Sequence, residues 1–345
     1  MNLKLKRFLV IRIDRIGDVV LSTPIPREVK SKYPDAFVAV LCRDYTKDVY
    51  IHNPNVDLII SLEELKEKGF WGTVFFLRKL KFDASLLLLP DEWINYVLFF
   101  SGIKCRVGTG YKFYQFITGV KGISRKKYIP LRHEADYCMD QARYLGIQTD
   151  NLTTEIVLTV EEKEKSSDLR KELLDGKKYL IGLHISSGGS APNWEPEKYL
   201  KLSEKLEEQN DVKVVFTDNV VPKNFPKEKQ NIFINFGKTL RETIISINSL
   251  DCLVSASTGP MHIAAALKVK TISLFCPLPA CSPKLWRPLG NESIELLPSE
   301  NYCQTKCPGD PKICTFDGDG GIEIKQVVEA VNAILKVYNG NRLHN

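Results

Sequence analysis

The sequence predicts an α/β protein made of two doubly wound domains with parallel sheets. Short apolar runs alternate with helical patterns along the whole chain, and this alternation starts again in the second half. The 345 residues are enough for two domains of ordinary size. With 43% hydrophobic and 26% charged residues, both domains can form a substantial core.

The first alternating series fills the N-terminal half. Apolar runs at 8–13, 37–42, 56–60 and 84–90 predict buried strands, and a helical pattern at 18–33 follows the first of them. The run at 153–160 predicts one more strand. The charged stretch that follows shows neither a core pattern nor a turn before Asp175 and Gly176. We therefore expect the domain boundary here, with domains at 1–165 and 166–345.

The second series repeats the alternation. Strands are predicted at 179–186, 212–217, 251–256 and 271–277, and helices at 196–209, 241–250, 261–268 and 324–338. Sheets of this kind bind ligands outside the carboxyl ends of their strands. Two such domains facing each other imply a cleft in which ligands bind.

Composition excludes several classes of protein. No apolar run approaches the roughly 18 residues of a membrane span. The N-terminus is too short in its apolar part for a signal peptide, because Arg12, Asp14 and Arg15 interrupt it. The nine cysteines are an odd number and mostly lie in apolar segments, as expected in a reducing compartment. We expect a cytoplasmic protein. P-loop, dinucleotide-binding and nucleophile-elbow motifs are missing.

Positive charge is concentrated in the N-terminal half. Residues 1–150 hold 24 Lys and Arg against 17 Asp and Glu, whereas the other 195 residues hold 24 against 25. Residues 101–132 contain eight basic residues, several aromatic ones and no acid. They form either a solvated loop region or a surface for an anionic partner, and we favour the surface. We expect Arg125, Lys126 and Lys127 to contact the acceptor or an anionic membrane face, not nucleic acid.

Two carboxylates stand where the first strand meets its helix. Asp18 falls in the first helical turn, where a negative charge contributes about 0.3–1 kcal/mol. Asp14 can serve as a local cap. One carboxylate is enough for these structural roles. The second either adds to them or acts as a general base at the mouth of the cleft.

The loops after two strands of the second domain suit phosphate groups. Ser186, Ser187 and Gly188 follow the strand at 179–186, in a loop whose small residues admit a ligand close to the backbone. The alternative is a flexible loop before a helix.

The second of these loops, at 257–260, opens the helix at 261–268. Ser257 and Thr258 are good N-caps, Gly259 allows close approach, and Pro260 suits the first turn. The helix N-terminus would then face a pyrophosphate. His262 is either a core histidine or a further phosphate contact.

Two segments of the sequence resemble a known family. FLVIRIDRIGDVVLSTPIPREVKSKYPDAFVAVLC at 8–42 resembles the N-terminal signature of glycosyltransferase family 9, the ADP-heptose–lipopolysaccharide heptosyltransferases. STGPMHIAAALKVKTISLFCP at 257–277 resembles its nucleotide motif. The segments occur in the family's order, about 240 residues apart. Asn193-Trp194, the WRPLG segment at 286–290 and the cysteine-containing tail also fit.

The resemblance implies a GT-B fold and an inverting sugar transfer that needs no metal or other cofactor. The family's catalytic aspartate belongs to a GDV motif and falls on Asp18, so Asp14 would be the structural residue. The donor would be a nucleotide diphosphate sugar such as ADP-heptose. The acceptor would be a lipopolysaccharide core or another lipid-linked oligosaccharide, reached at the inner face of the membrane. The N-terminal domain would serve the acceptor, and the C-terminal domain the donor.

Two departures from the family pattern leave other functions open. Ser257 stands where many members have aspartate, and Pro192 where many have lysine. A lost lysine removes one charge that stabilises the leaving pyrophosphate. The alternatives are a sugar-nucleotide epimerase of the same fold, or a degenerate homologue that binds glycans or serves as a scaffold without catalysis.

Two possible metal motifs carry little weight. Cys303, Cys307 and Cys314 lack an evident fourth ligand and match no standard zinc spacing. Asp317 and Asp319 lie in a glycine-rich segment before the last helix, which predicts a turn and cap.

Overall fold

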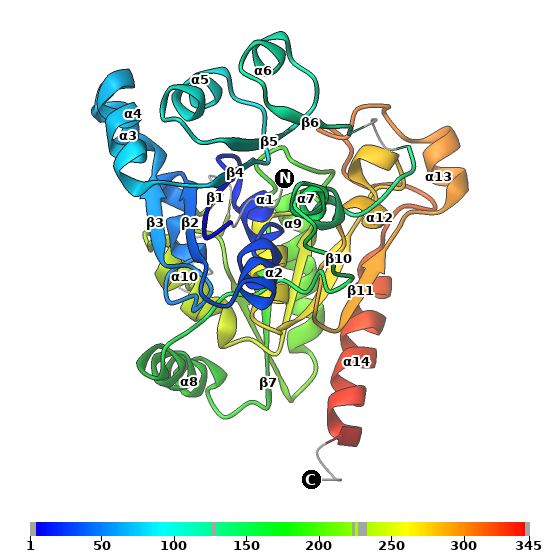
Figure 1. Ribbon diagram of the computed structural model, residues 1–345. Coiled ribbons are helices and arrows are strands. Elements are labelled where there is room, and N and C mark those ends of the chain that lie inside the picture. The colour runs from blue at the N-terminus through cyan, green and yellow to red at the C-terminus, as the bar shows by residue number, and fades with distance from the viewer. Residues whose placement is uncertain (1–4, 126–128, 223–224, 227–232, 342–345) are drawn as a thin grey trace. The chain divides into compact units, whose positions relative to one another are not determined.

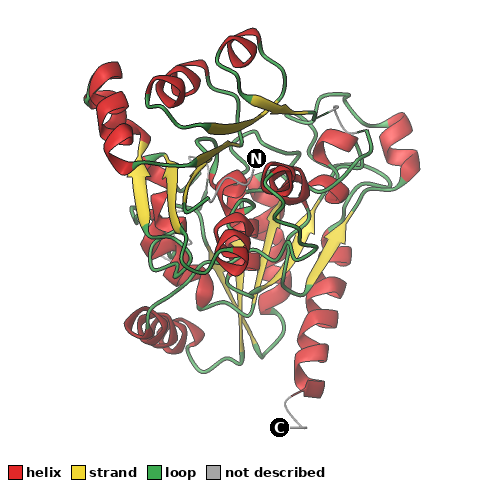
Figure 2. Cartoon of the chain, in the orientation of Figure 1, coloured by secondary structure: helices red, strands yellow, loops and turns green. Residues whose placement is uncertain are grey.

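The computed structural model describes residues 5–125, 129–222, 225–226 and 233–341, with the backbone alone for 336–341. The chain divides into two compact units, Met1–Val157 and Leu158–Asn345. Each unit is a parallel sheet with helices (Figures 1 and 2). The predicted α/β class is therefore observed in both units.

Unit 1 contains a six-stranded parallel sheet in the order β3-β2-β1-β4-β5-β6. The chain runs through β1 (Arg7–Ile11), α1 (Ile16–Val20), α2 (Pro24–Lys32), β2 (Phe37–Cys42), the 3-10 turn η1 (Asp44–Val49), β3 (Leu58–Ser61), α3 (Leu62–Glu67), α4 (Gly69–Leu80), β4 (Ala84–Leu87), α5 (Glu92–Phe100), β5 (Cys105–Thr109), α6 (Phe113–Ile117), β6 (Lys121–Ile123) and α7 (Glu134–Tyr144). Alternate strand residues such as Leu9 and Ile11 pack against α4 and α5 on one face of the sheet.

Unit 2 contains a five-stranded parallel sheet in the order β11-β10-β9-β7-β8. Its elements are α8 (Val160–Leu174), β7 (Tyr179–His184), α9 (Pro196–Glu207), β8 (Val212–Phe216), α10 (Leu240–Asn248), β9 (Cys252–Ala256), α11 (Gly259–Ala266), β10 (Lys270–Leu274), η3 (Pro279–Cys281), α12 (Pro283–Trp286), β11 (Ser293–Leu296), α13 (Glu300–Thr305) and α14 (Ile324–Asn341). The core includes Trp194, Tyr199 and residues of the last helix.

The predicted strand at 153–160 is wrong. These residues belong to no sheet. Hydrogen bonds to side chains, and not to a neighbouring strand, hold the segment. The backbone N–H of Glu155 donates to Thr23, and its carboxylate accepts from Asn53 and Asn55.

The charged stretch after it forms α8, and the expected boundary at 165/166 falls inside this helix. A capping box between Thr159 and Glu162 starts the helix.

The helix predicted at 18–33 is two helices. Pro24, which has no backbone N–H, begins α2 after α1 has ended at Val20. Within the described residues, no helix is long and apolar enough to cross a lipid bilayer.

Candidate active site

The order of the strands marks one place in unit 1 where a ligand can bind. Successive strands are added on one side of β1 as far as β3 and then on its other side from β4 onward, so the order reverses between β1 and β4. Doubly wound sheets bind their ligands outside the carboxyl ends of the strands at such a point. Arg12 and Asp14 follow β1 directly, and Asp18 lies on α1.

Arg12 is the centre of a buried ionic cluster at this point. It is only 3% exposed, and its guanidinium contacts three carboxylates. The Nε–H donates to Asp14 at 2.7 Å and one Nη2–H to Asp18 at 2.7 Å. Nη1 lies 3.3 Å from Oε1 of Glu134, which comes from α7 and is fully buried. A buried charge needs such partners, because losing water costs several kcal/mol per ion.

Arg125 supplies a second cation to the same cluster. Its guanidinium pairs with both carboxylate oxygens of Glu134 and lies 5.0 Å from the ring centre of Tyr137. The side chain thus neutralises a buried carboxylate within unit 1. Lys126 and Lys127, which we grouped with Arg125, lie outside the described residues.

Burial raises the pKa of Asp18 to about 6. The neighbouring charges of Asp14 and Glu134 raise this pKa as well, whereas Arg12 lowers it through its charge and its hydrogen bond. A carboxylate with a pKa near 6 is mostly ionised at neutral pH. It is also basic enough to accept a proton in a reaction, as a general base must.

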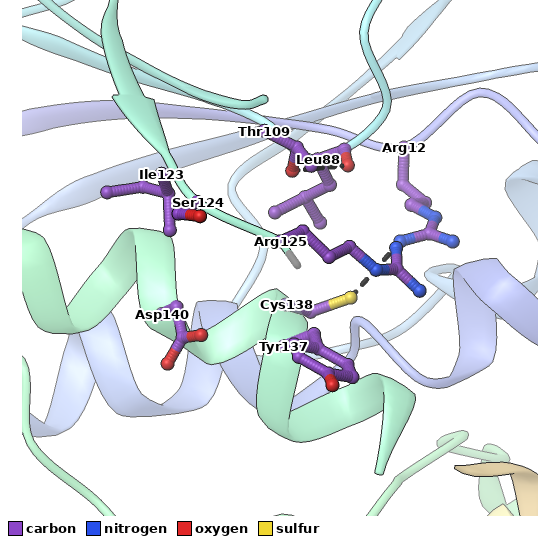
Figure 3. Close-up of a pocket in the computed structure, with 9 residues that line it drawn as sticks. All are labelled: Arg12, Leu88, Thr109, Ile123, Ser124, Arg125, Tyr137, Cys138 and Asp140. Carbon is purple, nitrogen blue, oxygen red and sulfur yellow. Dashed lines mark hydrogen bonds between the residues drawn. The ribbon is translucent and has the colours of Figure 1, made fainter. Parts of the chain in front are cut away.

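A pocket of unit 1 opens beside Arg12. Figure 3 shows the side chains that line it: Arg12, Leu88, Thr109, Ile123, Ser124, Arg125, Tyr137, Cys138 and Asp140. Nη1 of Arg12 lies 3.1 Å from the sulfur of Cys138. Two guanidinium groups, three hydroxyls and the carboxylate of Asp140 therefore border a small hollow, and one of the guanidinium groups, that of Arg12, also contacts Asp18.

Unit 2 has a corresponding point between β7 and β9, where its strand order reverses. The predicted residues Ser186, Ser187 and Gly188 follow β7, and Ser257 follows β9. The Ser190 hydroxyl lies 3.4 Å from the carbonyl oxygen of Ser257. The structure thus brings together the two loops that we predicted for the donor.

Thr258 is the N-cap residue of α11, as predicted, but its hydroxyl makes no capping bond. This hydroxyl is buried and has no hydrogen-bond partner among the described residues. The first turn of any helix leaves backbone N–H groups without helical partners. In α11 this turn contains Gly259, Pro260 and the buried His262. An unpaired hydroxyl beside a helix N-terminus suits an anionic oxygen.

Sequence reasoning missed Asp218, which fixes the loop after β7. Its buried carboxylate accepts the backbone N–H groups of Ile185 at 2.8 Å and Ser186 at 2.9 Å. The Ser186 amide is therefore occupied, which leaves its exposed hydroxyl, 3.3 Å from His184 Nε2, for a ligand. The signal that could have found Asp218 is its place directly after the predicted strand at 212–217.

The Asn193-Trp194 pair has a structural role. Trp194 is 2% exposed, and its indole N–H donates to the carbonyl oxygen of Ile322 at 3.1 Å. Asn193 accepts a hydrogen bond from Tyr199 at 2.8 Å. Asp317, the first aspartate of the segment before the last helix, pairs with Lys198 at 2.7 Å.

The C-terminal cysteines are free thiols, as are the other six. The sulfur of Cys314 lies 3.6 Å from the hydroxyl of Tyr302, inside the core of unit 2. In the part of the chain that the structure describes, no three His, Cys, Asp or Glu side chains are grouped so that they could hold a metal ion.

The model of glycosyltransferase family 9 (heptosyltransferase) matches residues 76–310. The chain belongs to glycosyltransferase family 9. It is 24% identical to lipopolysaccharide heptosyltransferase 2 of Escherichia coli over 95% of this chain and 98% of that protein. It is 25% identical to a putative glycosyltransferase of Haemophilus influenzae over 83% and 87% of the two chains.

Solved structures agree with this assignment at the level of the fold. The family 9 glycosyl transferase of Veillonella parvula aligns with a TM-score of 0.75 at 20% identity, over 97% of this chain and 98% of that one. The ADP-heptose heptosyltransferase II of Escherichia coli gives the same TM-score and identity, over 96% and 99%. The predicted GT-B fold class is confirmed, and the protein is a glycosyltransferase.

The Arg12 cluster leads to a prediction about stability. Arg12→Met removes the cation that Asp14, Asp18 and Glu134 share, and breaking a buried pair from one side typically costs about 3–5 kcal/mol. We expect a loss of this size in the free energy of unfolding, measured with urea at pH 7.5. Arg132→Met is the matched control, since it breaks a partly exposed network with Asp136 and Asp140 and should cost less than about 1 kcal/mol. Equal losses in the two variants would show that the Arg12 cluster does not carry the stability assigned to it.

Proposed function

We propose that the protein transfers a heptose from ADP-heptose to a sugar of a lipopolysaccharide core or another lipid-linked oligosaccharide, with inversion at the anomeric carbon. The observation that carries the proposal is Asp18. It is a half-buried carboxylate, 17% exposed, with a pKa of about 6, just after the carboxyl end of β1 in unit 1 and in the motif by which the chain resembles its family. The sugar and its carrier come from the names of relatives, such as lipopolysaccharide heptosyltransferase 2.

Asp18 acts as the general base in this proposal. Its carboxylate takes the proton of the acceptor hydroxyl while the hydroxyl oxygen forms a bond to the anomeric carbon of the donor. On the other side of that carbon, the bond to the diphosphate oxygen breaks and the nucleotide diphosphate leaves with the electron pair. Arg12 keeps Asp18 ionised and holds one of its oxygens, so that the other can face the acceptor.

Unit 2 binds the donor. The loops after β7 and β9 hold the diphosphate of the donor. They do so through the N-terminus of α11 and the hydroxyls of Ser186, Ser187, Ser257 and Thr258. Gly188, Gly259, Pro260 and His262 complete the proposed set. The unpaired hydroxyl of Thr258 supports this assignment most directly, because a buried donor without a partner costs about 1–3 kcal/mol unless a ligand satisfies it.

Unit 1 serves the acceptor. Its basic segment at 101–132 lies against a lipid-linked acceptor or the anionic membrane that carries it, as expected for an enzyme at the inner membrane face. The donor needs no contact with this segment.

Asp18→Asn is the direct test of the catalytic proposal. The amide cannot accept the proton, so we expect kcat for sugar transfer to fall by about 10²–10⁴-fold. Affinity for the donor, measured by calorimetry, should stay within a factor of about two, because Asp18 belongs to unit 1. Asp14→Asn is the matched control, as Asp14 contacts the same guanidinium at the same distance, and it should keep most of the activity. If Asp18→Asn kept more than a tenth of kcat, Asp18 would not be the base.

Thr258→Val tests the donor site. Valine keeps the shape of threonine and removes a hydroxyl that has no partner in the described structure, so stability should not fall. We expect the Kd for ADP-heptose to rise by about tenfold, in line with one lost hydrogen bond to a charged group. Ser85→Ala removes another unpaired buried hydroxyl, in β4 of unit 1, and should leave the Kd unchanged. An unchanged Kd in Thr258→Val would remove Thr258 from the donor site.

A further inference from the structure

Large apolar side chains are exposed on three neighbouring helices of unit 1. α5 packs against both α4 and α6, and Figure 1 shows the three helices along one side of the sheet. We call this surface the α4–α6 face. Its exposed members are Trp71, Phe75, Phe99, Phe100, Phe113, Phe116 and Ile117, together with Tyr111 just before α6, with exposures from 39% for Phe100 to 84% for Phe116.

The rings of α4 and α5 touch one another and form a continuous surface. The ring centre of Trp71 lies 5.5 Å from that of Phe100, which lies 5.2 Å from that of Phe99. Arg106 continues the surface toward α6, because its guanidinium lies 5.3 Å from the Phe99 ring centre and donates to the carbonyl oxygen of Thr118.

These aromatic side chains are not needed for the core. The inward sides of the same helices, with Val74 and Leu77 on α4 and Val97 and Leu98 on α5, already cover the sheet. A surface helix normally pairs such an apolar stripe with a polar outer side. Exposed apolar patches larger than a few hundred Å² mark sites of interaction with a protein or a membrane.

Charge identifies the kind of partner. Residues 68–82 hold four Lys and Arg and residues 93–133 hold eight, and neither segment contains an Asp or Glu. Among the described residues, Lys79, Lys104 and Lys112 take part in no ion pair. Two of the eight are paired within unit 1, Arg125 with Glu134 and Arg132 with Asp136 and Asp140.

We propose that the α4–α6 face docks on the surface of a bilayer with anionic lipid headgroups, with Trp71 and Phe75 entering the interfacial region. Trp and Tyr are enriched at this depth of membranes, and basic side chains around them attract anionic headgroups. A second copy of the chain fits less well, since a symmetric dimer through this face would bring its cations against one another. The inference deepens the proposed function and rests on its membrane-bound acceptor.

Vesicle binding tests the proposal. Vesicles of phosphatidylglycerol and phosphatidylcholine should pellet the wild-type protein, and pure phosphatidylcholine vesicles should pellet much less of it. Trp71→Ser with Phe75→Ser should lower the partition coefficient by about tenfold or more, because two apolar contacts are lost. Phe236→Ser is the matched control, since Phe236 is 66% exposed in unit 2 and should not matter. Equal pelleting of the double variant and the wild type would overturn the proposal.

Two further readouts separate the alternatives. Brominated lipids should quench the fluorescence of the wild type, and Trp71→Phe should bind vesicles while losing most of that quenching. Quenching that is undiminished in Trp71→Phe would place the docking surface elsewhere. A dimer in sedimentation that the double variant abolishes, together with no vesicle binding by the wild type, would assign the face to a second copy.

Transfer to a water-soluble, deacylated acceptor reports on the proposed function alone. The double variant should keep the wild-type kcat in this assay. Loss of vesicle binding with transfer retained supports the docking face. No transfer by the wild type would refute the proposed function while leaving the vesicle result to stand by itself.

Discussion

The buried guanidinium of Arg12 is the contact on which the proposed active site depends. It brings together carboxylates from two distant parts of unit 1: Asp14 and Asp18 follow β1, and Glu134 lies 122 residues after Arg12 on α7. The buried guanidinium and the carboxylates around it depend on one another, because a charge removed from water without a partner costs several kcal/mol. Arg12 therefore ties α7 to the end of β1 and at the same time sets the charge state of Asp18.

The proposed sites of the two units differ in charge: carboxylates line that of unit 1, and neutral groups line that of unit 2. Unit 1 buries the carboxylate of Glu134 and half-buries that of Asp18, and the loss of water that raises the pKa of Asp18 makes its ionised form costly for the folded state. That cost is the property a general base needs, since taking up a proton relieves it. Unit 2 presents hydroxyls and a helix N-terminus at the proposed donor site. These neutral groups suit a diphosphate, which brings its own charge.

Much of the fold and of the proposed donor site could be predicted from the sequence, because a strand or a motif is set by residues that are close together in the chain. The runs at 37–42 and 84–90 contain β2 and β4, and the two polar loops of unit 2 lie side by side as expected. The role of Arg12 could not be predicted, since its partner Glu134 is far away in the sequence. The segment at 153–160 has the composition of a strand, but Thr23, Asn53 and Asn55 hold it outside the sheet. No helix or strand was predicted in residues 101–132, because the helix and strands described there are short, from three to five residues.

The pH dependence of sugar transfer tests the central claim most directly. Because Asp18 must be ionised to accept a proton, kcat/KM should be constant above pH 7 and should fall about tenfold per pH unit below the pKa of Asp18, which is about 6. The residual activity of Asp18→Asn should not show this step. A wild-type profile that stays flat from pH 7.5 to 4.5 while the protein remains folded, or the same step in Asp18→Asn, would contradict the account.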